Sequence, residues 1–186
     1  MTVDDRTLAA LEARLARLED TEAVRETWLD YCTQIDLADY ERLGDVFAED
    51  AELELEGLAR AVDGTYRGRR SIIDDFYRRT AGPADGPPGS GRAMTGHLCT
   101  NMRIEVEGDE ASTLGYFFEI VDDNLVLIGT YQHRLRRETD RWRFTFKRIV
   151  VRYRARLETT GVKGSALTDV VARSVGGRPG ISHPSM

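Results

Sequence analysis

The sequence is poor in cysteine and histidine and has no long apolar run, and each shortage excludes a class of protein. Among 186 residues there are two cysteines and three histidines. Two cysteines, Cys32 and Cys99, cannot form a disulfide framework, so we expect free thiols in a reducing cytoplasm. No apolar run approaches the roughly 18 residues that a membrane span needs. The first residues, MTVDDRTLAALEARL, lack a basic region followed by an apolar one, so no signal peptide is expected.

Motifs for metals, nucleotides and nucleic acids are also missing. The sequence contains no CxxC, HExxH or P-loop pattern and no GxGxxG, so we expect neither a metal nor an organic cofactor. The formal net charge is −6 and the pI about 5.2, which disfavours a nucleic-acid partner.

Apolar periodicity predicts helices in the first half of the chain. Hydrophobic residues make up 41% of the sequence and charged residues 31%, as in an ordinary globular domain. Leucines at spacings of three and four predict a helix over residues 7–19, and Asp20 or Thr21 is expected to cap a second helix that ends near residues 37–39. Shorter helices are expected at residues 40–47 and 68–80, with short strands between them.

Alternating patterns predict four long antiparallel strands in the second half. They cover residues 94–110, 111–123, 125–140 and 141–157 and are joined by turn signals. The expected fold class is therefore α+β, with helices on one face of a curved antiparallel sheet. We expect one domain over residues 1–158, a partly flexible tail over 159–186, and a Gly/Pro-rich lid over residues 81–92.

The first long strand carries a polar group at every second position around His97. Thr95, His97, Cys99 and Asn101 alternate with Met94, Leu98 and Met102, so His97 and Asn101 are expected to share one face. If protein covers both faces of this strand, the polar face must line a solvated cavity or a catalytic site, because buried polar groups need hydrogen-bond partners. A structural histidine on an exposed face is the alternative interpretation of His97, and the same alternative holds for His133.

Asp36 is placed unusually on the second predicted helix. At about 100° per residue it lies roughly 40° from Cys32, and so borders an apolar stripe rather than opposing it. It also falls in the last turn, where the helix dipole disfavours a negative charge. A cationic or hydrogen-bonding partner is expected, and a solvated carboxylate at the rim is the alternative. The stripe consists of Val24, Trp28, Tyr31 and Ile35.

The last strand places an arginine after two phenylalanines of the same alternation. Phe144, Phe146 and Arg148 share one predicted face, and Arg152 continues it. An inward arginine needs an anion to meet. The alternative is that the strand leaves the sheet by Arg148, with both arginines exposed.

These segments together resemble the SnoaL-like branch of the NTF2-like superfamily. The resemblance covers Leu15 to Tyr153 and rests on four stretches: YCTQIDLADYERLGDVFAEDAELE, YRGRRSIIDDF, TGHLCTNMRIEVEGDEAST and GTYQHRLRRETDRWRFTFKR. It implies an NTF2-like cone, with helices packed on a strongly curved sheet around a cavity. Within that branch the chain looks most like bile-acid dehydratase, scytalone dehydratase and hexachlorocyclohexane dehydrochlorinase, which need no cofactor.

The resemblance implies a catalytic set of Tyr31, Asp36, His97 and Arg148, with Arg152 as the rival of Arg148. Asp36 would orient His97, a base of ordinary pKa near 6.5, and Tyr31 would donate a hydrogen bond to the substrate. The arginine would stabilise developing oxyanion charge. The resemblance also implies a small hydrophobic substrate, for which the candidate binding residues are Trp28, Asn101 and Tyr131.

Three functions are compatible with this site. The first is a cofactor-independent lyase that removes a carbon-bound proton and a leaving group from an alicyclic, steroid-like or polyketide-like compound. The second is an isomerase or cyclase with the same Asp–His pair, and the third is a non-catalytic binding protein like the dioxygenase β subunit. We also expect a homodimer or homotrimer, because strand positions that the helices leave uncovered would form a large apolar patch. They are Ile120, Leu135, Ile149 and Val151.

Overall fold

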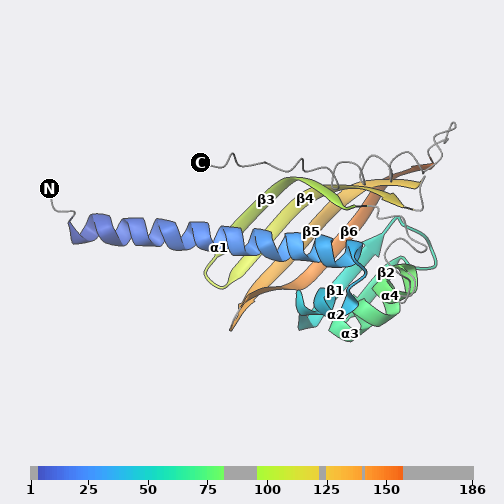
Figure 1. Cartoon of the computed structure of the whole chain (residues 1–186), viewed down its shortest axis with the longest axis horizontal. Coiled ribbons are helices and arrows are strands. Elements are labelled where there is room, and N and C mark those ends of the chain that lie inside the picture. Colours follow the sequence, from blue (N-terminus) through green and yellow to red (C-terminus); the bar gives the residue numbers. More distant parts are fainter. Residues whose placement is uncertain (1–3, 82–95, 122–124, 140, 157–186) are drawn as a thin grey trace, which may run out of the picture. The chain divides into compact units, whose positions relative to one another are not determined.

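The computed structural model describes residues 4–81, 96–121, 125–139 and 141–156 (Figure 1). The chain divides into two units, Met1–Arg156 and Leu157–Met186, and every described residue lies in the first unit. The predicted tail at residues 159–186 lies outside the described residues, and so does the predicted lid apart from Ala81.

One long helix, α1 (Asp5–Asp36), takes the place of the two helices expected in the first forty residues. It begins at Asp4, whose side chain accepts a hydrogen bond from the backbone N–H of Thr7 at 2.8 Å. The expected break at Asp20 or Thr21 is wrong, because no proline or glycine interrupts the helix there and both side chains are tolerated inside it. Asp20 instead forms an ion pair with Arg137 of the sheet.

The second half of α1 packs against the sheet and brings Asp36 to it. Its buried residues recur every three or four positions, as one helical face requires. The helix ends just after Asp36, since Ala38 adopts a left-handed backbone with φ of +54°, which a helix cannot continue through. The buried residues are Val24, Thr27, Trp28, Tyr31 and Cys32.

Six strands form a single sheet in the order β2-β1-β6-β5-β4-β3. All neighbouring pairs are antiparallel except β1 and β6, which run parallel. The sheet curls without closing, and α1 crosses it (Figure 1), so the predicted α+β class is confirmed. The strands are β1 (Phe47–Glu56), β2 (Gly64–Arg67), β3 (Leu98–Glu107), β4 (Glu110–Val121), β5 (Leu125–Glu138) and β6 (Arg141–Arg156).

Short helical segments lie around the β1–β2 hairpin. The first, α2 (Tyr40–Asp45), links α1 to β1, with Asp39 as its N-cap. The helix predicted at residues 68–80 forms as three consecutive pieces: α3 (Arg69–Ser71), a π-helical turn η1 (Ile72–Tyr77) and α4 (Arg78–Ala81). The π turn adds a residue to the helical spacing and buries four neighbouring side chains at once. They are Ile72, Ile73, Phe76 and Tyr77.

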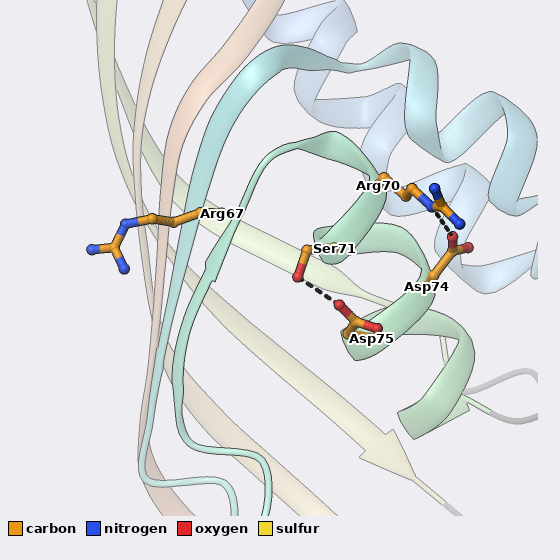
Figure 2. A pocket seen from close by; sticks show the side chains of 5 residues that line it. All are labelled: Arg67, Arg70, Ser71, Asp74 and Asp75. Atoms are coloured by element: carbon orange, nitrogen blue, oxygen red, sulfur yellow. Dashed lines mark hydrogen bonds and ion pairs between the residues drawn. The ribbon is translucent and has the colours of Figure 1, made fainter.

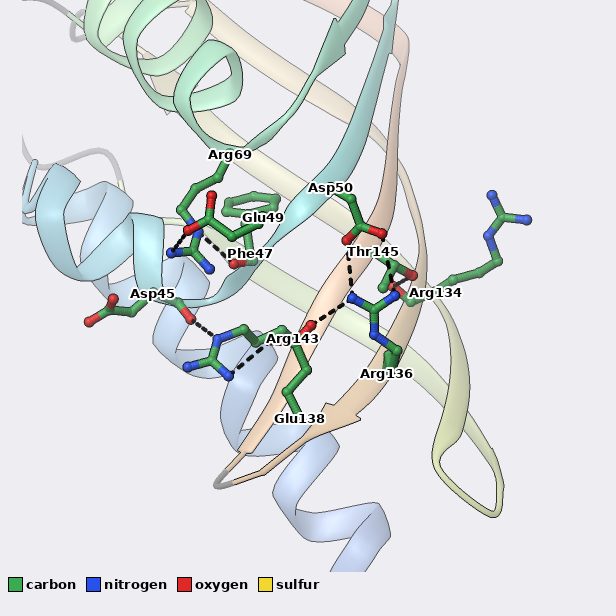
Figure 3. Close-up of polar contacts among 10 residues, drawn as sticks. All are labelled: Asp45, Phe47, Glu49, Asp50, Arg69, Arg134, Arg136, Glu138, Arg143 and Thr145. Atoms are coloured by element: carbon green, nitrogen blue, oxygen red, sulfur yellow. Dashed lines mark hydrogen bonds and ion pairs between the residues drawn. The ribbon is translucent and has the colours of Figure 1, made fainter.

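A group of ion pairs joins β1, β5 and β6 at their surface (Figure 3). Arg136 binds Asp50 at 3.1 Å and Glu138 at 2.7 Å, and Arg143 binds Glu138 at 3.3 Å. Arg143 also donates from Nε to the backbone oxygen of Asp45 at 3.1 Å. Pairs as exposed as Arg136 and Asp50 each contribute under about 1 kcal/mol. These ion pairs therefore connect three strands at the surface but contribute little to stability.

The apolar patch expected on uncovered strand positions does not form as predicted. Leu135 and Ile149 are only 2% and 7% exposed, so both already belong to the core of one chain. The large apolar side chains that are exposed lie elsewhere: Leu8, Leu11, Leu15, Leu18, Leu29, Leu37, Leu98, Leu114, Tyr116 and Tyr153.

No helix within the described ranges is long and apolar enough to cross a membrane.

Candidate functional site

Asp36 and His97 meet where the end of α1 faces the start of β3. The Nδ1–H of His97 donates to Asp36 Oδ1 at 2.5 Å, and the backbone N–H of His97 donates to Asp36 Oδ2 at 2.9 Å. One carboxylate therefore holds both the ring and the backbone of the histidine. The side chain of His97 is 6% exposed and that of Asp36 is 18% exposed. The pair is therefore buried, and the alternative of a solvated carboxylate at the rim is wrong.

The other ring nitrogen of His97 faces a second carboxylate, which the sequence pattern did not predict. Nε2 lies 3.6 Å from Oε2 of Glu119 on β4. Burial, the largest single effect, lowers the pKa of His97, but the Asp36 hydrogen bond and the charges of Glu119 and Asp36 together raise it above the ordinary value. The expected base of unperturbed pKa is thus replaced by a histidine biased toward the imidazolium form.

A β-bulge in β3 determines which residues share a face with His97. The β3–β4 pairing shifts between Thr100 and Arg103, and Asn101 has a left-handed φ of +52°. The predicted alternation therefore breaks at the bulge. His97 and Cys99 lie inward before it, whereas Leu98 and Asn101 are exposed. The prediction that Asn101 lines the site is wrong.

A second bulge, in β6, replaces the expected arginine with a lysine. The β5–β6 pairing shifts between Arg134 and Leu135, which pair with Phe146 and Phe144, so Thr145 is the extra residue. Before the bulge the even-numbered residues Trp142 and Phe144 are buried, and after it the odd-numbered residues Lys147 and Ile149 are buried. Lys147 is completely buried, and Arg148 points outward.

Both predicted arginines lie on the surface. Arg148 binds Glu56 at 2.9 Å and Glu54 at 3.6 Å on the neighbouring β1, and Arg152 is exposed. The prediction that Arg148 or Arg152 faces the interior is therefore wrong. Nothing in the local sequence distinguishes Lys147 as inward, because the extra residue is visible only in the pairing of the strands.

Lys147 lies in an aromatic environment at the centre of the domain. Its Nζ is 3.7 Å from the centroid of the Tyr31 ring and 3.8 Å from that of Tyr131. The Nζ also donates to Nε2 of His133 at 2.8 Å, and Nδ1–H of His133 donates to Oγ1 of Thr113 at 2.7 Å. His133 is 2% exposed, so the interpretation that placed it on an exposed face is wrong, although its hydrogen bonds are satisfied inside the domain.

Burial controls the protonation of this group. It lowers the pKa of Lys147 to about 7, against an ordinary value of 10.5, and lowers the pKa of His133 well below its usual range. The interior therefore holds an amine that exchanges its proton near neutral pH. No carboxylate of the described residues forms an ion pair with Lys147. A buried amine in such surroundings is unfavourable, and groups of this kind gather at functional sites.

The three predicted aromatic residues all reach the interior. Tyr31 is 1% exposed, its ring lies 6.3 Å from that of His97, and its hydroxyl accepts a hydrogen bond from Tyr77 at 3.2 Å. Burial raises the pKa of Tyr31 well above 10, so the hydroxyl keeps its proton. Trp28 and Tyr131 are also buried, and Trp28 packs so tightly on Gly115 that a Cβ there would lie 2.5 Å from the indole. Trp28 is thus a core residue in this structure.

The two cysteines lie side by side next to the Asp–His pair. Cys32 Sγ and Cys99 Sγ are 3.5 Å apart, and both are free thiols, as expected. The hydrogen bond from Cys32, supported by the charge of Lys147, lowers the pKa of Cys99 to about 7, whereas that of Cys32 is raised. Cys32 is one helical turn before Asp36, and Cys99 is two residues after His97.

Two surface hollows lie away from this interior group. Arg67, Arg70, Ser71, Asp74 and Asp75 line one of them, near the β1–β2 hairpin (Figure 2). Its polar groups satisfy each other, since Arg70 binds Asp74 at 3.6 Å and Ser71 donates to Asp75 at 2.7 Å. The other is lined by Leu125 and residues 154–156 at the far end of β5 and β6. Neither contains a residue of the Asp–His pair.

Metal binding finds no support in the part of the chain that the structure describes. Within those residues, no group of three or more His, Cys, Asp or Glu side chains is arranged to hold a metal ion.

Several solved structures have the same fold at low sequence identity. A hexachlorocyclohexane dehydrochlorinase, LinA type 2, is 22% identical with a TM-score of 0.63, over 82% of this chain and 98% of that one. A putative scytalone dehydratase from Novosphingobium aromaticivorans is 20% identical with a TM-score of 0.60, over 78% and 92% of the two chains. An NTF2-like protein with a cystatin-like fold from the same organism is 24% identical with a TM-score of 0.58, over 92% and 98%.

These likenesses establish the fold, and the sequence itself establishes the family. No curated protein sequence matches the chain significantly. The SnoaL-like domain family matches residues 16–148, a span that includes the end of α1, the start of β3 and β6 as far as Lys147 and Arg148. The chain therefore belongs to the SnoaL-like domain family.

Proposed function

We propose that the protein is a cofactor-independent lyase that eliminates water, or a comparable leaving group, from a small alicyclic, steroid-like or polyketide-like compound. The observation that carries the proposal is the double hydrogen bond by which Asp36 holds the buried His97. A carboxylate in this position fixes the histidine tautomer and stabilises the imidazolium that forms on proton abstraction. The names of two similar structures, a dehydrochlorinase and a putative scytalone dehydratase, agree with elimination chemistry.

The proposed reaction begins when neutral His97 removes a carbon-bound proton through Nε2. A carbonyl next to that carbon makes the proton acidic, and the C–H electron pair becomes the new double bond as the β-hydroxyl leaves. The proton on His97 then passes to the leaving hydroxyl, which departs as water. Glu119 lies beside Nε2 and favours the imidazolium once it has formed.

Lys147 and Tyr31 supply the remaining groups of the proposed mechanism. The protonated amine of Lys147 provides the interior positive charge that was expected from Arg148, and this charge favours the enolate-like transition state. Tyr31 retains its hydroxyl proton and packs between Lys147 and His97. It is the expected hydrogen-bond donor to a carbonyl or a leaving hydroxyl.

An isomerase or cyclase is the second candidate, because its first step is the same proton abstraction. Mass spectrometry of products separates the candidates. A panel of alicyclic, steroid-like and polyketide-like compounds with a hydroxyl β to a carbonyl should include one that loses 18 Da, the mass of water. An unchanged mass with a new retention time supports the isomerase, and binding without turnover supports a non-catalytic ligand-binding protein.

Proton abstraction itself is tested by hydrogen exchange in D₂O, followed by NMR on the substrate or on an unreactive analogue without the leaving group. His97→Gln should slow the exchange by about 10²–10⁴-fold, the usual contribution of a positioned base. Asp36→Asn should slow it comparably, and the double variant should lose little more, because the two residues act as one unit. Exchange at the wild-type rate in His97→Gln contradicts the proposal.

A further inference from the structure

The first half of α1 is a helix with nothing packed on it in the part of the chain that the structure describes. Every residue from Asp4 to Glu19 is exposed, although α1 continues unbroken to Asp36. In Figure 1 this half of the helix runs beyond the sheet. An isolated helix of about this length is only marginally stable in water, so a partner along it would add to its stability.

Four leucines form an apolar stripe along this half of the helix. Leu8, Leu11, Leu15 and Leu18 are spaced by three, four and three residues and are 50%, 50%, 57% and 67% exposed. This spacing is the a and d pattern of a coiled coil over two heptads. The next a and d positions are Glu22 and Arg25, which bind each other at 3.1 Å, so the apolar stripe ends at Leu18.

The leucine stripe faces away from the sheet. At about 100° per residue, its centre lies roughly 150° around α1 from the centre of the face that buries Val24, Trp28 and Tyr31. A helix of another chain can therefore lie along the stripe without contacting the sheet, because the sheet lies on the opposite side of α1.

The flanking charges indicate which partner fits. With Leu8 and Leu15 at position a, Arg14 takes position g, and Glu12 and Glu19 take position e. In a parallel pair of identical helices, each g residue faces the e residue five positions further along the other helix. Arg14 then faces Glu19 of the partner subunit, twice by symmetry. In the antiparallel pair, e faces e, which opposes glutamate to glutamate.

We propose that α1 pairs with α1 of a second copy of this chain, as a parallel two-stranded coiled coil over residues 8–18 with Arg14–Glu19 ion pairs across it. The interface is independent of the proposed lyase function. Because the apolar core spans only two heptads, the dimer should be weak, with a dissociation constant on the order of micromolar.

Sedimentation equilibrium of the full chain from about 1 to 200 μM tests the pairing. The wild type should change from monomer to dimer in this range. Leu11→Gln with Leu15→Gln should remain monomeric, whereas the matched control Ala9→Gln with Ala13→Gln, on the other side of the helix, should dimerise like the wild type. Thermal unfolding of the sheet should be alike in both variants, because all four positions are exposed.

Charge exchange tests the orientation. Arg14→Glu and Glu19→Arg should each weaken the dimer by about 3-fold or more, since each places like charges opposite one another. The double exchange, R14E with E19R, should restore it, and salt should lessen all three differences. A monomeric or trimeric wild type, a dimer unaffected by the leucine changes, or a double exchange without restoration overturns the proposal.

Discussion

Replacing Lys147 by methionine should stabilise the protein while it destroys activity. Methionine has a similar length and no charge, so it can fill the space between the rings of Tyr31 and Tyr131. In the native protein this space holds an amine whose pKa is about 7 in the folded state and 10.5 when unfolded. The folded state therefore binds fewer protons than the unfolded state between these values.

The pKa difference sets the size of the effect. Each pKa unit corresponds to about 1.4 kcal/mol, so the lysine lowers the free energy of unfolding by about 4 kcal/mol at pH 7. Methionine removes this penalty but also removes the hydrogen bond to His133 and the ring contacts, together worth about 2 kcal/mol. Lys147→Met should therefore gain about 2 kcal/mol at pH 7.

The sign of the pH dependence makes the prediction specific to a buried amine. As pH rises from 7 toward 10.5, the unfolded state also loses its proton and the penalty disappears. The advantage of Lys147→Met over the wild type should therefore shrink by about 2 kcal/mol between pH 7 and 9. Cys99 titrates in the same range, and its pKa depends partly on Lys147, so the pair should also be compared in a Cys99→Ser background.

Urea unfolding at several pH values provides the measurement, with Arg148→Met as the matched control. Arg148 is the next residue on β6 and also loses a positive charge, but it lies on the surface in ion pairs with Glu54 and Glu56. Its variant should differ from the wild type by under about 1 kcal/mol at every pH. A Lys147→Met advantage that does not change between pH 7 and 9 would refute the argument. Turnover of the true substrate should fall by about 10²-fold or more in Lys147→Met, since it loses the interior charge.

Three further outcomes are expected. Glu119→Gln removes a charge beside Nε2 of His97, so the midpoint of the kcat/KM pH profile should fall toward 6.5; an unchanged midpoint contradicts the role of Glu119. His97→Gln should lose stability relative to the wild type at pH 5, and less at pH 9, because a raised folded-state pKa stabilises only below that pKa; urea unfolding checks this. Arg148→Met should keep at least half of the wild-type turnover in a steady-state assay, whereas a 10²-fold loss would restore Arg148 as a site residue.

The sequence by itself determined the fold class, the four long strands and, through the family resemblance, the central contact of the site. Helical spacing, strand alternation and turn signals are local properties, and they predicted the α+β class and the four long strands. The position of Asp36 at the edge of an apolar stripe predicted a cationic or hydrogen-bonding partner, with a solvated carboxylate as the alternative, and the family resemblance identified His97 as that partner. The predicted break between two helices at Asp20 or Thr21 was wrong, because polar residues of this kind can either cap a helix or lie within one.

Only the tertiary structure decided which side chains point inward beyond each bulge. Alternation has a period of two, so one extra residue exchanges the faces of everything after it. The extra residues at Asn101 and Thr145 are fixed by pairing with β4 and β5, which are distant in sequence. For this reason Asn101 and Arg148 were placed inside by their local pattern, although pairing across the sheet places Lys147 there instead.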